Sequence, residues 1–138
     1  MFSIKLYLAV LLVFLACDAV WIGLLMKDFY NTELGELARR DGPSLAPRWP
    51  AAILVYLLIP LGIVVFVRPA MGPSATLLQA LGWGLLFGLI GYGIYDLTNR
   101  ATLENWSLRL TIVDILWGAL LCGSAAVTMR AVERWLQR

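Results

Sequence analysis

The sequence predicts an all-α protein, a four-helix transmembrane bundle that forms a single domain over residues 1–138. Hydrophobic residues make up 61% of the 138 residues and charged residues only 14%, whereas soluble domains carry about 25% charged residues. Four apolar segments, residues 6–26, 50–67, 76–97 and 110–129, have the length that a membrane crossing requires. Because lipid offers the backbone no hydrogen-bond partners, these segments are expected to be helices.

The composition also excludes several classes of function. The net charge is only +2 and there is no run of basic residues, so nucleic acid is not expected as a partner. The chain has no histidine, which is the commonest metal ligand and general base. Cys17 and Cys122 lie inside apolar segments and are interpreted as small buried hydrophobic residues. We therefore expect no cofactor and no metal site.

The first span begins after Lys5, as the core of a signal peptide would. Its apolar run continues past Cys17 and through Trp21 to Met26, which is too long for such a core. We therefore expect a spanning helix that stays in the protein.

The connection over residues 27–49 is predicted to contain a short interfacial helix. Phe29, Leu34 and Leu37 lie on roughly one helical face over residues 28–40, and Asp41-Gly42-Pro43 ends the pattern. The helix is interpreted either as a lid over the mouth of the bundle or as a simple connector.

Particular residues shape the second and third spans. Pro60 removes a hydrogen bond from the second span and is expected to kink it. Gly84 and Gly88 form a Gly-xxx-Gly pair in the third span, which allows another helix to approach closely. That helix belongs either to the same chain or to a second copy, so a homodimer through the Gly84/Gly88 face is one expectation. The third connection, residues 98–109, is expected to form a short helix with Trp106 at the membrane interface.

The fourth span is expected to continue into a tail over residues 130–138, anchored among the lipid headgroups by Trp135 and the arginines. An even number of spans places both termini on one side of the membrane. That side carries five basic residues and the other side six, so the positive-inside rule does not decide the orientation. The basic tail favours cytoplasmic termini.

Three carboxylates lie inside the predicted spans, and the alternating directions of the spans place them in the same half of the bilayer. They are Asp18, Asp96 and Asp114. Charged groups are costly in hydrocarbon, so they indicate a functional site by default. Trp21 and Trp117 each follow an aspartate by three residues, on spans of opposite direction. If these spans are neighbours, each indole N–H is expected to donate to the carboxylate of the other span.

The candidate site gathers these groups with the polar residues near them. The candidate catalytic residues are Asp18, Asp96 and Asp114, and the candidate ligand-binding residues are Trp21, Tyr92, Tyr95, Asn99, Arg100, Trp106 and Trp117. No lysine lies inside a span, so an arginine folds in, the carboxylates share protons, or the ligand brings a positive or hydrogen-bonding group. The alternative for each aspartate is structural, as a helix cap or as a protonated group that ties helices together.

A further observation is a resemblance to a known family. The third span ends in Tyr95-Asp96-Leu97-Thr98-Asn99, and Trp106 and then Asp114-x-x-Trp117-Gly118 follow. With this signature, the chain resembles an uncharacterised family of small four-span bacterial inner-membrane proteins, classed as a domain of unknown function. The resemblance implies a multi-pass protein of the bacterial inner membrane with no established activity, and it gives a hint of lipid-modification gene neighbourhoods.

Three functions follow from this sequence. The leading hypothesis is a small membrane protein that binds a lipid-like or small amphipathic ligand in a polar half-membrane cavity. Acid–base chemistry by the carboxylates is possible there, so whether it is an enzyme stays open. The second is a proton-coupled transport or channel subunit acting as a homo-oligomer, and the third is an assembly partner of a larger membrane complex. A transporter should show a water path to both sides, whereas a packing protein should show satisfied aspartates and no cavity.

Overall fold

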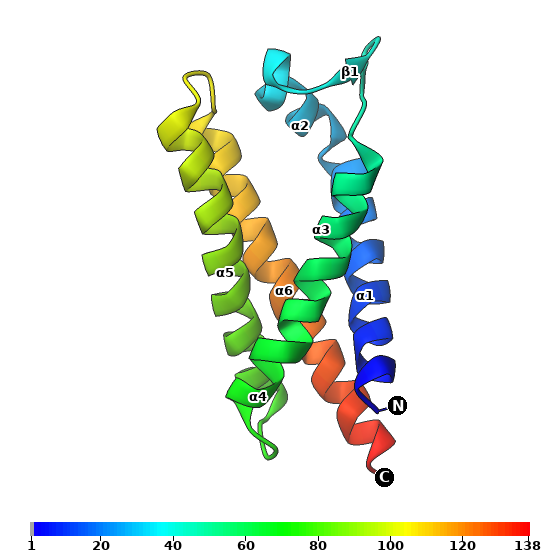
Figure 1. Ribbon diagram of the computed structural model, residues 1–138. Coiled ribbons are helices and arrows are strands. Elements are labelled where there is room, and N and C mark those ends of the chain that lie inside the picture. Colours follow the sequence, from blue (N-terminus) through cyan, green and yellow to red (C-terminus); the bar gives the residue numbers. More distant parts are fainter. Residues whose placement is uncertain (1) are drawn as a thin grey trace.

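Four long helices run up and down in alternation, and both termini lie at the same end of the bundle (Figure 1). The structure is a computed structural model that describes residues 2–138. Within this range the helices long and apolar enough to cross a membrane are Ile4–Leu25, Trp49–Met71, Leu77–Thr102 and Leu108–Leu136. The predicted four-helix membrane bundle is confirmed, and each helix is longer than the span predicted for it.

The first helix consists of α1 (Phe2–Val20) and a π-helical turn, η1 (Trp21–Leu25). Helix α2 (Lys27–Leu34) then lies across the end of the bundle away from the termini (Figure 1). Gly35, with a φ of +47°, ends this helix because the left-handed region favours glycine. The short 3-10 helix η2 (Gly35–Leu37) follows.

The interfacial helix predicted over residues 28–40 is therefore too long. After η2 the chain forms a small hairpin of two strands, β1 (Arg40–Asp41) and β2 (Ser44–Leu45). Gly42, with a φ of +58°, lies in the turn between them. The Arg40 guanidinium donates to the Asn31 carbonyl at 2.7 Å and so attaches the hairpin to α2.

The second span consists of α3 (Trp49–Gly62), the π-helical η3 (Ile63–Val67) and the short α4 (Arg68–Met71). Pro60 lies inside α3 and is buried. A proline has no N–H to donate to the preceding turn, and the hydrogen-bonding pattern changes from α to π shortly after it. The irregularity expected at Pro60 thus takes the form of a widened turn.

The third and fourth spans are α5 (Leu77–Thr102) and α6 (Leu108–Leu136). Helix α5 begins with a capping box, in which Thr76 and Gln79 each bind the backbone N–H of the other. It continues to Thr102, so the short helix predicted in the third connection is wrong. Trp106 lies in the connection between the two spans, is only 5% exposed and packs in a cluster with Tyr30.

Helices α5 and α6 pack most closely where α5 carries Gly84 and Gly88. A Cβ atom built on Gly84 would lie 2.5 Å from the Cys122 carbonyl oxygen and 2.7 Å from Cβ of Ala126. Gly88 meets the backbone of Gly118 and Ala119 in the same way. The Gly-xxx-Gly pair therefore makes its close contact with α6 of the same chain.

We expect Gly84→Ala to lower the free energy of unfolding by about 1–3 kcal/mol, because the new methyl group must push α5 away from α6. Unfolding by SDS titration in mild detergent would measure this. Gly82→Ala is the matched control, since a Cβ on Gly82 meets no atom within 4 Å. Equal stability of the two variants would contradict the close packing.

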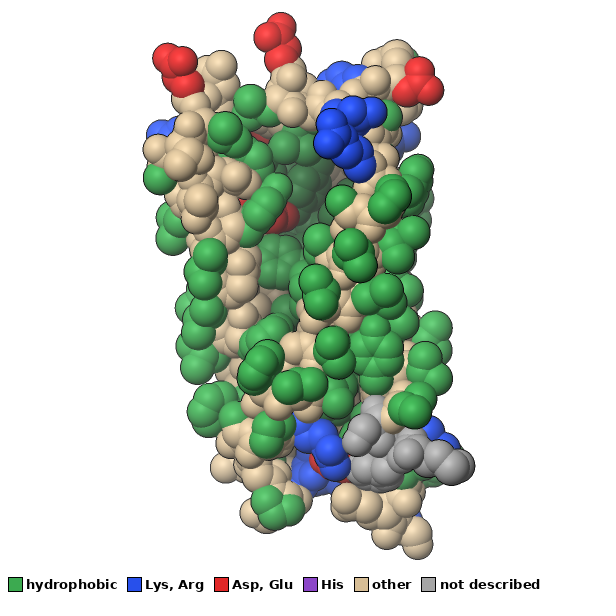
Figure 2. All heavy atoms as spheres, in the orientation of Figure 1, with side chains coloured by type: hydrophobic (Ala, Val, Ile, Leu, Met, Phe, Trp, Pro, Cys, Tyr) green, Lys and Arg blue, Asp and Glu red, His purple; other side chains and the backbone are tan. Residues whose placement is uncertain are grey.

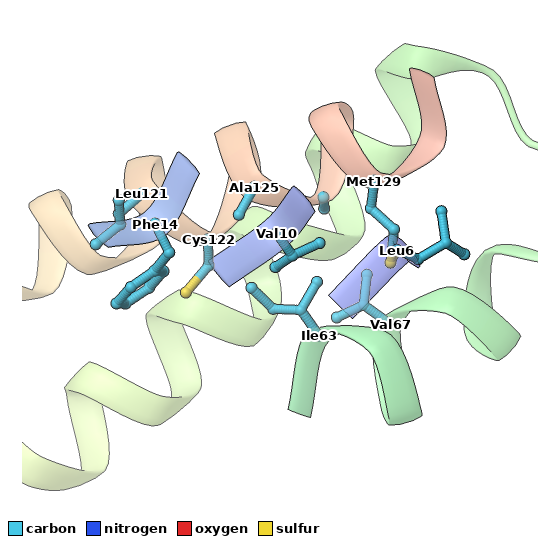
Figure 3. Packing of buried hydrophobic residues seen from close by; sticks show 10 residues of the cluster. Leu6, Val10, Phe14, Ile63, Val67, Leu121, Cys122, Ala125 and Met129 are labelled. Atoms are coloured by element: carbon cyan, nitrogen blue, oxygen red, sulfur yellow. The ribbon is translucent and has the colours of Figure 1, made fainter. Parts of the chain in front are cut away.

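A hydrophobic core fills the half of the bundle nearer the termini (Figure 3). Helix α1, the η3 turn and α6 supply it, with Leu6, Val10, Phe14, Ile63, Val67, Leu121, Cys122, Ala125, Ala126 and Met129. Charged side chains gather mainly at the two ends of the molecule, with a hydrophobic belt between them (Figure 2).

Beyond this core, at the end that holds the termini, lies an ion-pair cluster in which Arg130 and Glu133 are buried and Arg68 is half-buried. Nε of Arg68 and Nη1 of Arg130 each lie 2.8 Å from a carboxylate oxygen of Glu133. Arg130 also donates to the carbonyls of Ala75, at 2.8 Å, and Pro73. Because Arg130 is only 3% exposed, its predicted role as a headgroup anchor is wrong: it folds inward and ties the α4–α5 connection to α6.

Candidate functional site

Asp18, Asp96 and Asp114 lie in the half of the bundle covered by α2, as the up-and-down order of the spans predicts. They come from α1, α5 and α6, respectively. Helix α1 packs against α6, and α6 packs against α5 along its length. The three carboxyl groups therefore lie on neighbouring helices around α6.

Asp18 is 4% exposed and is held by two donors. The Tyr56 hydroxyl of α3 donates to one carboxyl oxygen at 2.7 Å, and Nε1 of Trp117 of α6 donates to the other at 2.9 Å. The bond from Trp117 is one of the two indole bonds expected from the sequence. Asp18 thus joins three helices by hydrogen bonds.

The second indole, that of Trp21, is linked to Asp114 only through Tyr30. Trp21 stacks on Trp117, with ring centroids 4.3 Å apart and planes 6° from parallel. Nε1 of Trp21 donates to the Tyr30 hydroxyl at 3.2 Å, and that hydroxyl donates to Oδ1 of Asp114 at 2.5 Å. The expected direct bond from Trp21 to Asp114 is wrong, because Tyr30 lies between them.

Tyr30 and Tyr56 are site residues that the sequence analysis missed. Tyr30 comes from α2 and is 5% exposed. Burial, the charge of Asp114 and the hydrogen bond to it raise the pKa of Tyr30 above its ordinary value. The phenol therefore stays protonated at neutral pH and serves as a donor. The predicted apolar face of this segment was built on Phe29, Leu34 and Leu37, and Tyr30 falls beside that face.

Asp96 and Asp114 form a carboxyl pair. Asp96 is 0% exposed, and among residues 2–138 no N–H or hydroxyl donor reaches either of its carboxyl oxygens. Its carboxyl group lies beside that of Asp114. Two ionised carboxylates side by side repel each other. The sharing of a proton, one of the three solutions that the lack of an embedded lysine leaves open, stays a prediction.

A cavity of about 370 Å³ lies beside this pair, and we refer to it as the α3–α5 cavity. Its lining residues are Val55, Ile59, Phe87, Gly88, Gly91, Tyr92, Tyr95, Asp114 and Cys122. Helix α5 meets the second span at η3 and α4, and above them α3 and α5 diverge (Figure 1). Figure 2 shows the hollow between two apolar columns, with acidic atoms visible inside it. Val55 and Tyr95 are each more than half exposed on this face, so the cavity opens sideways, toward the bilayer.

The predicted site residues differ in where they lie relative to the cavity. Tyr92, Tyr95 and Asp114 line the cavity. Asp18, Trp21 and Trp117 belong to the hydrogen-bonded and stacked network described above. Asp96 lies against Asp114 and is not a lining residue.

The remaining predicted residues lie toward the mouth of the bundle. Asn99 is within hydrogen-bond reach of the Tyr95 hydroxyl, and Trp106 packs edge-to-face on Tyr95 with centroids 5.8 Å apart. Nη1 of Arg100 donates to the Trp106 carbonyl at 2.6 Å. Arg109 pairs with Glu33 at 3.2 Å. Both arginines are engaged at the mouth, and neither lines the cavity.

A comparison with protein families matches residues 3–130 to the family described as Predicted membrane protein (DUF2177). The chain belongs to this family. The match confirms the resemblance drawn from the sequence, and it covers the first three spans, most of the fourth and every residue of the candidate site. No curated protein and no solved structure matches the chain.

Proposed function

We propose that this protein binds a lipid-like or small amphipathic molecule in the α3–α5 cavity. One observation carries the proposal: a hollow that opens sideways in the membrane half of the bundle has apolar walls and a carboxyl group, Asp114, among its lining. Such a site matches a molecule with an apolar chain and a polar head, and that molecule can enter from the bilayer. Binding sites are typically concave, mostly apolar and equipped with few polar groups.

The carboxyl pair supports a binding site over a purely structural role. Asp18 has two donors and ties helices together, so packing alone accounts for it. Asp96 has none among the described residues, although it is fully buried. An unsatisfied buried carboxyl group lowers stability, and its retention is expected where function needs it.

The packing between the two ends favours a half-membrane site over a transport path. The carboxyl pair lies toward α2, and the Arg68–Arg130–Glu133 cluster lies at the other end. Along α6, the core residues from Leu121 to Met129 lie between Asp114 and Arg130. A path for water or protons through the monomer would have to open this core.

The pair also gives the protein the means for acid–base chemistry on its ligand. Asp114 lines the cavity and would face the ligand, while Asp96 behind it would hold or receive the proton. A protonated carboxyl group next to an ionised one is the arrangement of many general acid–base sites. Asp18 would act as a positioning residue that holds Trp117 in place.

We also propose that the protein lies in the bacterial inner membrane with its termini in the cytoplasm. The basic C-terminal tail, which carries Arg134 and Arg138, lies at the end that holds the termini (Figure 1). This placement is supported by the affinity of basic residues for the cytoplasmic face.

Mass spectrometry of lipids and small molecules that co-purify in mild detergent tests the binding proposal. Gly91 lines the cavity, and a Cβ added there meets no atom within 4 Å, so Gly91→Phe would fill the cavity without a backbone clash. Gly82→Phe places the same ring elsewhere on α5, also in open space. We expect a specific molecule with the wild type and with Gly82→Phe, and its loss with Gly91→Phe. The same bulk lipids in all three preparations would contradict the proposal.

A further inference from the structure

Resting on the proposed function, we propose that the ligand is a cationic amphiphile, with an ammonium-type head beside Asp114 and its chain between α3 and α5. The inference concerns the sign of the charge that the cavity selects. It follows from the charges around the cavity, the engagement of the nearby arginines and the rings in its wall.

The titratable groups of the spans near the cavity are carboxyl groups. Asp18, Asp96 and Asp114 come from three adjacent helices, and Asp114 lines the cavity itself. The groups that bind Asp18 and Asp114, an indole and two phenols, are neutral donors. A negative charge in a medium of low dielectric constant attracts a cation strongly.

Among residues 2–138, no basic side chain is part of the cavity lining. Arg100 is bound to the Trp106 carbonyl, and Arg109 is paired with Glu33 and lies over the Phe29 ring at 5.7 Å. Arg68 and Arg130 belong to the cluster at the opposite end. The ligand therefore has to bring the positive charge.

The walls of the cavity also suit an ammonium head. Phe87, Tyr92 and Tyr95 contribute three aromatic rings, and aromatic faces attract quaternary ammonium groups. Val55 and Ile59 on the α3 side provide the apolar surface for a chain. An anionic head would face the carboxyl pair with like charge, and a neutral alcohol would gain only hydrogen bonds.

Three probes with one chain length separate the possibilities: dodecyltrimethylammonium, dodecanol and dodecanoate. Their binding to the protein in nanodiscs of zwitterionic lipid would be measured against empty nanodiscs. We expect the ammonium probe to bind most tightly, to lose its binding in Gly91→Phe and to keep it in Gly82→Phe. Asp114→Asn should weaken its binding about tenfold or more. The asparagine side chain still accepts a hydrogen bond from Tyr30.

The outcomes distinguish this inference from the function on which it rests. If dodecanol or dodecanoate binds as tightly as the ammonium probe and Gly91→Phe removes that binding, the charge selection is overturned and the binding function stands. If Gly91→Phe removes the binding of no probe, both are overturned. Should Asp114→Asn fail to fold, the comparison of the three probes on the wild type still decides the charge selection.

Discussion

Glu133→Leu is expected to lower the free energy of unfolding by about 3–5 kcal/mol, because it leaves Arg130 buried without its carboxylate. Side chains of Arg130 and Glu133 are 4% and 7% exposed, so water cannot take the place of the lost partner. The carbonyls of Pro73 and Ala75 would keep their bonds to the guanidinium but cannot neutralise its charge. SDS titration in mild detergent would measure the loss.

Two further variants make this expectation specific. Glu104→Gln removes an exposed carboxylate from the third connection and should change stability by less than about 0.5 kcal/mol. The double variant Arg130→Met with Glu133→Leu removes both charges and should recover a large part of the loss, since apolar replacements of a buried pair are often tolerated. If the double variant is less stable than Glu133→Leu alone, the buried charge is not the cause.

Asp18→Ala is expected to destabilise the protein by about 2–4 kcal/mol. The substitution leaves two donors, the Tyr56 hydroxyl and Nε1 of Trp117, without an acceptor. The variant disconnects α1 from α3 and α6 in the half of the bundle that holds the cavity. The unfolding free energy gives the size of the effect, and tryptophan fluorescence reports whether the Trp21–Trp117 stack is kept.

Asp18→Asn is the variant to compare with Asp18→Ala, because an asparagine side chain keeps one acceptor oxygen. We expect it to lose about half as much stability as Asp18→Ala and to keep the cavity ligand. Loss of ligand in Asp18→Asn while the fold is kept would show that Asp18 contacts the ligand, in conflict with the positioning role assigned to it.

The spans and the gathering of the aspartates could be predicted because both depend on the bilayer. Apolar runs of membrane length must be helices, and alternation of direction alone places Asp18, Asp96 and Asp114 in one half of the membrane. The spacing of Asp18 and Trp117 on antiparallel helices even predicted their hydrogen bond.

What the sequence analysis missed depends on tertiary contacts. Tyr30 reaches Asp114 only because α2 folds over the bundle, and the short hairpin after it follows from turn glycines rather than from apolar periodicity. Arg130 looks like an interfacial anchor in the sequence, since nothing local shows that Glu133 and two loop carbonyls will enclose it. The cavity itself results from the divergence of α3 and α5, which no local pattern encodes.

Photo-crosslinking in nanodiscs, with a lipid that carries a diazirine in its acyl chain, shows whether an amphiphile occupies the α3–α5 cavity. We expect adducts on Val55, Ile59 and Tyr95 several-fold above those on the outward-facing Leu12 and Leu120, which are 66% and 56% exposed. Gly91→Phe should remove this enrichment and Gly82→Phe should keep it. Adducts that follow exposure alone, with the same pattern in both variants, would contradict the claim.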